Sequence, residues 1–307
     1  MRDFQLTLLG TNAAFPAFGR ITSCQILNYK DSLILIDCGE GCQIRLNEYK
    51  IRRNKIQYIC ISHLHGDHVY GLPGLLTSYN HKDRGKPLIV IGPLGIKKFI
   101  LNLLENSYTH ISYDLQFIEL DHKGIEKVAQ MGDISISAFP LDHRIPTYGY
   151  RFDECLLDYN IRKESIVRHS LNIEEIKRAK AGVDIVRENG SIRFSDVVVP
   201  KGKPRSYAYC SDTVYDPGLI KYIQKVDLLY HETTYMHDLA EQAKERKHST
   251  SKEAALIAKG ADVGRLITGH YSSRYRTVDE LLHETREYFP NSEKGYDGAI
   301  FFLETKR

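Results

Sequence analysis

The sequence lacks several features that would assign it to a special class of protein. It contains no run of about 18 apolar residues, so no segment is predicted to cross a membrane. The N-terminus has an early acidic residue, Asp3, and no apolar core of signal-peptide length, so we expect a cytoplasmic protein. The six cysteines form no Cys-x-x-Cys pair, which argues against a cysteine zinc site and favours free thiols in a reducing compartment.

A strong net charge is also missing. The 307 residues carry a formal net charge of only +3, which is too little to indicate nucleic-acid binding by the whole chain. Residues 162–205, however, contain eleven Lys and Arg against six Asp and Glu. We interpret residues 153–204 as a basic arm inserted into a single domain of residues 1–307, because this segment is polar and interrupted by Gly and Pro. Such a segment either contacts a polyanion or is a solvated face, and the sequence leaves both open.

The densest chemical feature is a run of metal-capable side chains: His63, His65, Asp67 and His68. An apolar, β-prone run precedes it, so the pattern predicts a buried strand, a sharp loop and then a helix. His63 and His65 are two residues apart, so in an extended segment they point the same way and can hold one ion. Gly66 lets the chain turn, so Asp67 and His68 face a second ion. Imidazole with carboxylate suits zinc, and less strongly manganese or iron.

Three more candidate ligands follow apolar strand-like runs: His143, Asp212 and His270. Strand ends on one edge of a sheet converge even when they are far apart in sequence. The simplest allocation gives one ion to His63, His65 and His143 and the other to Asp67, His68 and His270, with Asp212 as the bridge. For one isolated histidine, a surface or satisfied core position is the commoner explanation, and only the joint pattern indicates a two-metal site. Asp37, after another apolar run, either supports a ligand imidazole or caps a helix.

The run His-x-His-x-Asp-His resembles the signature of the metallo-β-lactamase fold, and the chain as a whole resembles the ribonuclease Z family of tRNA 3′-processing endonucleases. The motifs that carry this resemblance, besides the histidine run, are Gly10-Thr11, Asp37–Gly41, Leu141–His143, Asp212-Thr213, His231–Thr234, His248–Thr250 and Thr268–His270. The resemblance implies an α/β protein, a four-layer αβ/βα sandwich with two mixed sheets. It also implies two Zn²⁺ per subunit, with Mn²⁺ as the alternative. It further implies a homodimer in which an arm of one subunit holds the precursor tRNA that the other subunit cuts.

The reaction implied by this resemblance is cleavage on the 3′ side of the discriminator nucleotide, which leaves a 3′-hydroxyl. In this hypothesis Asp67 orients the attacking water and takes its proton. His248, steadied by Glu232, protonates the leaving 3′ oxygen. Alternatively, His248 only forms a hydrogen bond with the backbone where a helix begins.

Two stretches depart from the family pattern. The pattern Pro-x-Lys-x-Arg-Asn after the first strand reads Pro16-Ala17-Phe18-Gly19-Arg20-Ile21 here, which keeps only the proline and the arginine. The arm lacks the Gly-Pro and Gly-x-Leu-Lys-x-Gly runs and is shortened. Two other functions therefore stay open: a hydrolase of the same fold that acts on small phosphodiesters or sulfate esters, and a catalytically idle protein that binds RNA or stores metal.

Overall fold

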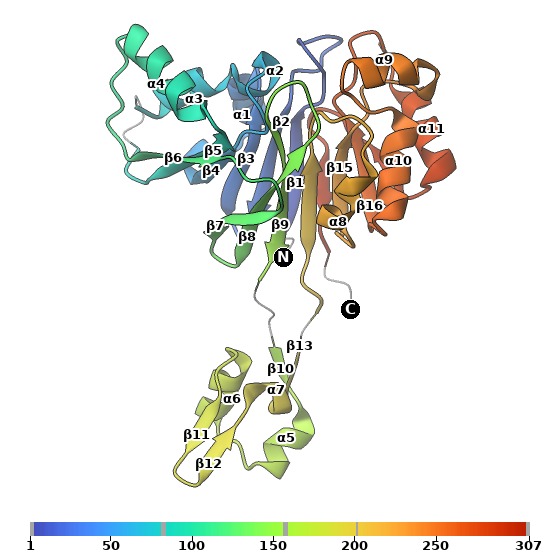
Figure 1. Ribbon diagram of the computed structural model, residues 1–307. Helices are drawn as coiled ribbons and strands as arrows, with labels where there is room; N and C mark the ends of the chain where they lie inside the picture. Colours follow the sequence, from blue (N-terminus) through green and yellow to red (C-terminus); the bar gives the residue numbers. More distant parts are fainter. Residues whose placement is uncertain (1–2, 81–83, 156–158, 201, 305–307) are drawn as a thin grey trace. The chain divides into compact units, whose positions relative to one another are not determined.

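The computed structural model describes residues 3–80, 84–155, 159–200 and 202–304. The chain up to Phe152 and again from Ser206 to Leu303 forms one compact unit, and Asp153–Arg205 groups as a second unit. The first unit contains two mixed β-sheets that face each other (Figure 1). The free cysteines are Cys24, Cys38, Cys42, Cys60, Cys155 and Cys210, as predicted.

The first sheet is built mainly from the N-terminal half of the chain. Its spatial order is β18 (Ile300–Phe302), β1 (Phe4–Gly10), β2 (Cys24–Tyr29), β3 (Ser32–Cys38), β4 (Ile56–Cys60), β5 (Leu88–Pro93) and β6 (Leu115–Leu120). The strands β18, β1, β2 and β3 pair antiparallel, and β3 to β6 pair parallel. The hairpin of β2 and β3 turns at Lys30 and Asp31, whose φ angles of 47° and 69° match the twist of hairpin strands.

The second sheet comes from the later part of the chain. Its spatial order is β17 (Ser292–Lys294), β16 (Arg265–Gly269), β15 (Leu228–Glu232), β14 (Ser206–Cys210), β9 (Thr147–Glu154), β8 (Ile134–Leu141) and β7 (Glu126–Met131). The strands β14 to β17 pair parallel, whereas β7 and β8 pair antiparallel. The sheet is therefore mixed, like the first.

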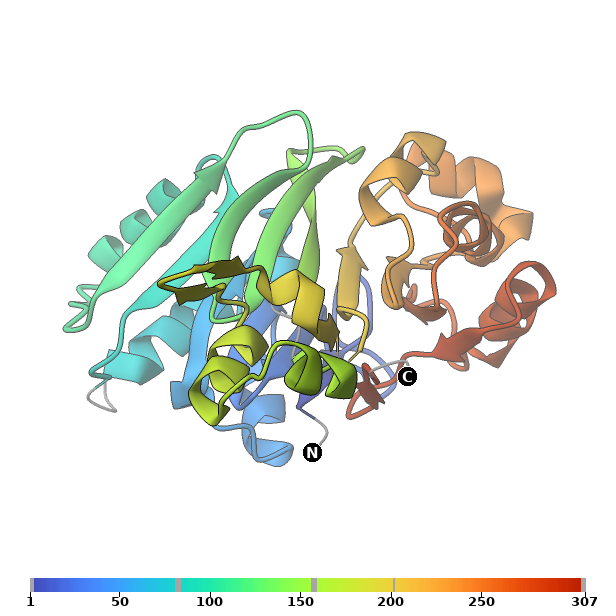
Figure 2. The same cartoon turned by 90° about the horizontal axis from the view of Figure 1, so that it is seen from below.

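Helices flank both sheets on their outer sides (Figures 1 and 2). Between the strands β3 and β6 of the first sheet, the chain forms α1 (Cys42–Glu48), the 3-10 turn η1 (Arg53–Lys55), α2 (Gly66–Val69), α3 (Leu72–Asn80) and α4 (Ile96–Asn106). The second sheet is accompanied by η2 (Pro217–Leu219), α8 (Ile220–Ile223), η3 (His237–Leu239), α9 (Ala240–Glu245), α10 (Ser251–Gly260) and α11 (Asp279–Tyr288). In the described ranges, no helix has the length and apolarity that crossing a membrane requires.

Strand β3 shows why the layers form. Its residues alternate: Ile34 and Ile36 pack between the sheets with Tyr150, whereas Leu33 and Leu35 pack against the helices on the outer side. A strand buried on both faces needs an unbroken apolar run, which is what the sequence has here. Helix, sheet, sheet and helix are thus stacked in that order, and the predicted α/β sandwich with two mixed sheets is confirmed.

The sandwich brings loops of both sheets together at one edge. Because β3 and β4 run parallel, their C-terminal ends deliver Asp37 and His63 to the same edge. The parallel strands β14 and β16 do the same for Asp212 and His270 in the second sheet. A backbone hydrogen bond of 2.9 Å from Tyr148 N, in β9 of the second sheet, to Ser62 O, just after β4 of the first sheet, joins the two sheets close to this edge.

The unit Asp153–Arg205 has regular structure of its own. It contains β10 (Tyr159–Ile161), α5 (Lys163–Arg168), α6 (Ile173–Lys180), β11 (Ile185–Arg187), β12 (Gly190–Ile192), α7 (Phe194–Val197) and β13 (Val198–Pro200). A small apolar core is formed by Leu171, Ala179, Ile185, Val197 and Val198. Asn172 and Glu175 form a capping box at the start of α6, so local sequence specifies where this helix begins.

Candidate metal centre and active site

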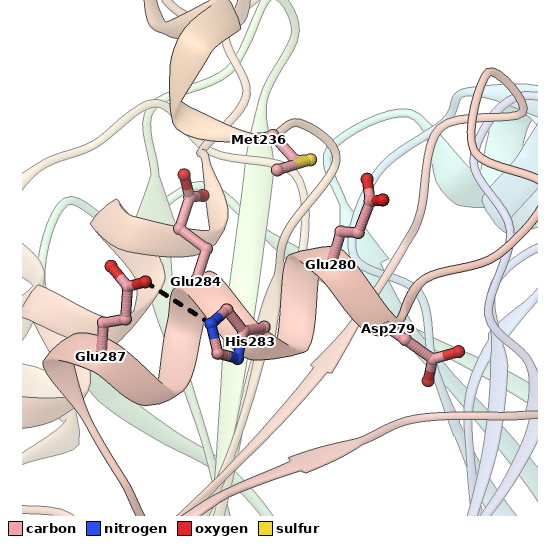
Figure 3. Close-up of a pocket in the computed structure, with 6 residues that line it drawn as sticks. All are labelled: Met236, Asp279, Glu280, His283, Glu284 and Glu287. Carbon is pink, nitrogen blue, oxygen red and sulfur yellow. Dashed lines mark ion pairs between the residues drawn. The ribbon is translucent and has the colours of Figure 1, made fainter.

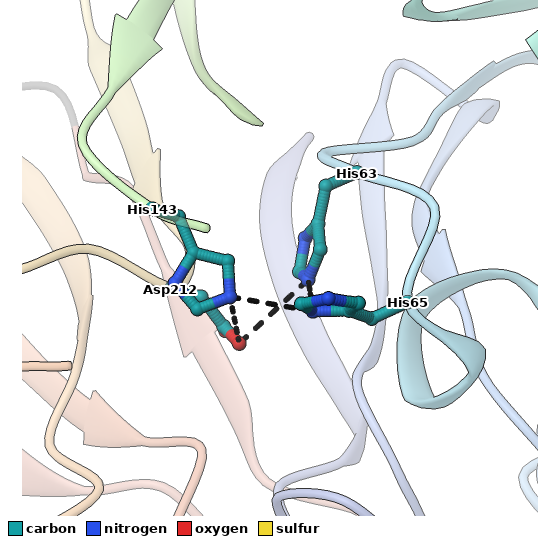
Figure 4. A group of neighbouring side chains, drawn as sticks. All are labelled: His63, His65, His143 and Asp212. Atoms are coloured by element: carbon teal, nitrogen blue, oxygen red, sulfur yellow. Dashed lines mark hydrogen bonds and ion pairs between the residues drawn. The ribbon is translucent and has the colours of Figure 1, made fainter. Parts of the chain in front are cut away.

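The structure brings all seven predicted ligand side chains together. In the first group, His65 Nδ1 lies 3.0 Å from His63 Nε2 and 3.3 Å from His143 Nε2. Asp212 Oδ2 lies 3.7 Å from His63 Nε2 and 3.8 Å from His143 Nε2. Figure 4 shows these four side chains pointing at a common centre, with His63 and His65 on one loop and His143 and Asp212 on two others.

The second group lies beside the first. The Nε2 atoms of His68 and His270 are 3.2 Å apart, and Asp67 Oδ2 lies 3.6 Å and 3.5 Å from them, respectively. Asp212 faces this group with its other oxygen, since Oδ1 is 3.3 Å from His68 Nε2 and 3.2 Å from His270 Nε2. One carboxylate therefore contacts both groups, and the role of Asp212 as a bridge between two ions stays a prediction.

The donor set fits two divalent ions. Ligands about 2.1 Å from a tetrahedral ion lie roughly 3.4 Å from each other, close to the spacings found here. Neutral imidazoles and carboxylates together suit zinc, with manganese as the weaker fit. His63, His68, Asp212 and His270 are also buried, so few water molecules compete with these four side chains for an ion.

A second layer of contacts fixes the histidine rings. In four rings the outer nitrogen, which is the Nδ1 that faces away from the ligand groups, has a hydrogen-bond partner. The pairs are His68 Nδ1 with Asp37 Oδ2 at 2.7 Å, His143 Nδ1 with Lys247 O at 2.8 Å, His270 Nδ1 with Thr234 Oγ1 at 2.9 Å, and His63 Nδ1 with Ser62 Oγ at 3.0 Å. Hydrogen bonds at the outer nitrogen set the tautomer and aim the inner nitrogen at the ion. The site is therefore ordered by the protein itself.

Asp37 is the most heavily used of these partners. It accepts hydrogen bonds from Ser62 N at 2.7 Å, Ser62 Oγ at 2.8 Å and Tyr209 Oη at 2.6 Å, in addition to the contact with His68. The residue that caps α1 is Gly41, so Asp37 supports a ligand imidazole and does not cap the helix. Sequence reasoning did not find Tyr209, because nothing near it along the chain marks it as a partner.

Burial and charge act differently on the two histidine groups. Burial lowers the pKa of His63, His65 and His143, so these rings are neutral and can offer a lone pair. Burial also opposes charge on His68, but Asp212 and two other carboxylates raise its pKa well above the usual value. The second group thus carries excess negative charge that a proton or a metal ion can balance.

An ion pair with a fully buried carboxylate lies next to the candidate metal ligands. Glu232 is 0% exposed, and its Oε1 accepts a hydrogen bond from His248 Nδ1 at 3.0 Å. The same carboxylate accepts from Ser249 N at 2.9 Å and from Thr234 Oγ1 at 2.6 Å. Burial alone would lower the pKa of His248, but Glu232 raises it to about 9. The His248 ring thus bonds to Glu232, and the cap of α10 is supplied by Thr250 instead.

Asp67 has a partner that the sequence did not reveal. The backbone N–H of Ala14, in the loop after β1, donates to Asp67 Oδ2 at 2.7 Å. Burial would raise the pKa of Asp67, but His68 and His270 bring it well below its usual value. This carboxylate is therefore ionised and oriented by the first loop of the chain.

A separate hollow of about 560 Å³ lies over α11 (Figure 3). It is lined by Met236, Asp279, Glu280, His283, Glu284 and Glu287. Its carboxylates would repel the phosphates of a nucleic acid, and it contains none of the predicted metal ligands. The buried groups at the sheet edge, and not this hollow, are the candidate active site.

Comparison with known proteins identifies relatives over almost the whole chain. The chain is 39% identical over 306 residues to a ribonuclease Z of Cytophaga hutchinsonii, covering 99% of this chain and 97% of the relative. It is 36% identical over 299 residues to a ribonuclease Z of Parabacteroides distasonis, covering 97% and 98%. The family model described as anti-Pycsar protein Apyc1 matches residues 4–167, which end before Asp212 and the later site residues.

Solved structures share this fold. Human tRNase Z, short form (ELAC1), superimposes with a TM-score of 0.71 at 26% identity, covering 98% of this chain and 99% of that chain. The metallo-β-lactamase fold protein YhfI from Bacillus subtilis gives a TM-score of 0.70 at 19% identity and covers 97% and 98%. The fold is therefore of the metallo-β-lactamase type. With relatives matched from end to end, the chain belongs to the ribonuclease Z family, and its first half also fits the family model of anti-Pycsar protein Apyc1.

Proposed function

We propose that this protein is a zinc-dependent endoribonuclease that cleaves precursor tRNA on the 3′ side of the discriminator and leaves a 3′-hydroxyl. The observation that carries the proposal is the pair of Glu232 and His248, in which the carboxylate is fully buried, directly beside the cluster of seven candidate ligands. A protein that only stored metal would not need a charged, oriented imidazole at 3.9 Å from the bridging carboxylate of Asp212. Membership of the ribonuclease Z family supports the choice of RNA as substrate.

The metal ligands are proposed as His63, His65 and His143 for one Zn²⁺, Asp67, His68 and His270 for the other, and Asp212 for both. When bound, the ions supply charge stabilisation to a phosphodiester and lower the pKa of water. The protein contributes fixed rings, since each outer nitrogen described above already has its partner.

His248 is the proposed general acid. Its Nδ1–H is held by Glu232, so the proton that can reach a leaving 3′ oxygen is the one on Nε2. Asp67 accepts a hydrogen bond from Ala14 N and is oriented for one from the attacking water. Because its pKa is lowered, this carboxylate is better suited to orienting the water than to storing the proton.

The basic unit of residues 153–204 is the proposed tRNA-holding arm. Its exposed cations include Arg162, Lys163, Lys177, Arg178 and Lys180. Exposed Lys and Arg side chains neutralise phosphates without reading sequence, which suits a surface that must accept many tRNA precursors. We also propose a homodimer in which the arm of one subunit serves the other, and a cytoplasmic location.

The first test compares His248→Ala and Asp67→Ala with the wild-type enzyme on a precursor tRNA. A general acid contributes roughly 10²–10⁴-fold, so cleavage by His248→Ala should fall by at least about 10²-fold while its zinc content stays normal. Asp67→Ala should lose cleavage and metal together. His283→Ala, at an exposed histidine on α11, is the matched control. Normal cleavage by His248→Ala would remove it from the mechanism.

The second test replaces residues 162–203 with a short linker. Binding of precursor tRNA should weaken and its dependence on salt should decrease, because fewer phosphates are neutralised. Hydrolysis of bis-p-nitrophenyl phosphate should be nearly unchanged. Equal loss of both activities would contradict a role for the arm in holding RNA. A wild-type enzyme that hydrolyses only the small ester would favour the alternative function on small phosphodiesters, which the altered loop after β1 suggests.

A further inference from the structure

The loop after β1, residues 11–22, is held firmly beside the metal centre. Besides the hydrogen bond from Ala14 N to Asp67 Oδ2, the N–H of Ile21 donates to Asp297 Oδ2 at 2.8 Å. Arg45 of α1 donates to Gly19 O. In Figure 1 the dark-blue loop rises at the same edge as α2. These contacts tie the loop to three separate parts of the first unit.

Arg20 fixes the loop from inside. Its guanidinium donates to Asn12 Oδ1 at 2.9 Å, to Tyr275 O at 2.7 Å and to Arg276 O at 3.2 Å. Asn12 in turn donates through Nδ2 to Phe15 O at 2.6 Å. The loop is therefore cross-linked to itself and to the segment that follows His270, so its conformation is set before any ligand binds.

The tip of the loop has a residue that does not suit its backbone. Ala17 and Arg20 exchange hydrogen bonds of 3.0 Å and 2.9 Å, with Phe18 and Gly19 at the turn. The φ angles of Phe18 and Gly19 are 53° and 77°, a turn at which Asn-Gly or Gly-Gly is preferred. A bulky residue in this region is strained, and strain of this kind concentrates at functional sites.

The strained side chain is also exposed. The ring of Phe18 is 54% exposed, and the guanidinium carbon of Arg20 lies 5.6 Å from its centroid. Phe15, next to the residue that contacts Asp67, is likewise 54% exposed. Folding explains neither ring, because neither belongs to an apolar core and one of them disfavours its own turn. A ligand that lies flat on an aromatic surface would explain both.

We propose that Phe15 and Phe18 form a stacking platform for unpaired nucleobases beside the scissile phosphodiester. This inference rests on the proposed function and identifies the part of the substrate that the first loop recognises. Every base has a π-face, so aromatic stacking tolerates any sequence. A platform that is rigid in the free protein loses little conformational freedom on binding, which favours affinity. The platform is apolar, whereas the arm carries cations. The platform is therefore suited to bases and the arm to phosphates.

The test combines Phe18→Ala and Phe15→Ala with precursor tRNA that is abasic at the nucleotides flanking the cleaved bond. Each variant should lower kcat/KM on the normal precursor by about tenfold, within the range measured for one stacked base. The abasic precursor should lower wild-type kcat/KM by a similar factor. On the abasic precursor, the alanine variants should lose little more, because the contact is already absent. Phe18→Trp should keep wild-type activity.

Tyr108→Ala is the matched control. Tyr108 is also an exposed aromatic residue with a positive φ, at 98% exposure and 53°, but it follows α4 and contacts none of the site residues described here. It should cleave both precursors like wild type. Zinc content and melting temperature of all variants should stay normal, which separates loss of stacking from collapse of the loop.

Three results would overturn the inference. Wild-type kcat/KM for Phe15→Ala and Phe18→Ala on the normal precursor would show that the rings are not used. If the alanine substitutions lowered kcat/KM on the abasic precursor as much as on the normal precursor, the two rings would act without contacting a base. A changed oligomeric state with normal cleavage would assign the rings to contact with a second copy. If the wild-type protein cleaves no precursor at all, the proposed function fails first, and the inference fails with it.

Discussion

Substitution of Glu232 by Gln tests the centre of the proposed mechanism, because it removes one charge and almost no volume. Oε1 of this buried carboxylate accepts from Thr213 N at 3.2 Å, His248 Nδ1 at 3.0 Å and Ser249 N at 2.9 Å. The glutamine oxygen should take this position, since the amide NH₂ cannot face three donors. The NH₂ then replaces Oε2, so Thr234 N–H loses its acceptor, whereas the Thr234 hydroxyl can still donate to His270 O at 3.0 Å.

The magnitudes follow from these contacts. One buried donor left without a partner costs about 1–3 kcal/mol, so the Glu232→Gln variant should fold with a melting temperature lower by several degrees, roughly 2–10 °C. The effect on His248 is larger. With its pKa raised to about 9, His248 is about 90% protonated at pH 8. At the ordinary pKa of about 6.5 it would be only about 3% protonated, and burial would lower it further.

Cleavage of precursor tRNA should therefore be measured from pH 5.5 to pH 9.5 under single-turnover conditions. The alkaline decrease in wild-type rate is expected near pH 9, and in Glu232→Gln below pH 7, so the contribution of protonation to the ratio of the two rates should rise from near one at pH 6 to roughly thirty at pH 8. Glu253→Gln, in the capping box of α10, is the matched control and should keep the wild-type profile. Identical profiles for wild type and Glu232→Gln would refute the assignment of His248 as the acid.

Three further predictions concern the metal, a helix cap and stability. Asp212→Ala removes one oxygen from each ligand group, so purified variant should contain well under the wild-type amount of zinc by emission spectroscopy; retention of both ions would contradict the bridging role. Thr250→Ala breaks the capping box of α10 and should cost about 1 kcal/mol, seen as a melting temperature lower by roughly 2–4 °C; an unchanged value would mean that the cap adds nothing. In chelated protein, the His248 pKa of about 9 lies above the unfolded value of about 6.5, so its stabilisation is complete below pH 6.5 and is lost as the pH rises through 9. Urea titrations should show that the free energy of unfolding decreases by roughly 3 kcal/mol over this interval in wild type and changes little in His248→Gln. Equal decreases in the two proteins would refute this prediction.

Much of the fold was predictable because its central strands are buried on both faces. The apolar runs of β3, β4, β14 and β16 marked strands that the structure confirms. The strands that the sequence did not reveal are short or peripheral, namely β7, β10, β11, β12, β13 and β17. These strands bury few side chains, so their residues show no clear alternation, and backbone pairing with a neighbour decides them.

The sequence by itself determined which side chains could hold metal, because histidine and aspartate at the ends of apolar runs are a local pattern. It could not determine the partner of each atom. The structure alone assigns one oxygen of Asp212 to each ligand group, turns Glu232 onto His248 and brings Ala14 to Asp67. Such contacts join residues as far apart in the sequence as His63 and Asp212, and their distances depend on how two sheets pack, which no local preference of the chain encodes.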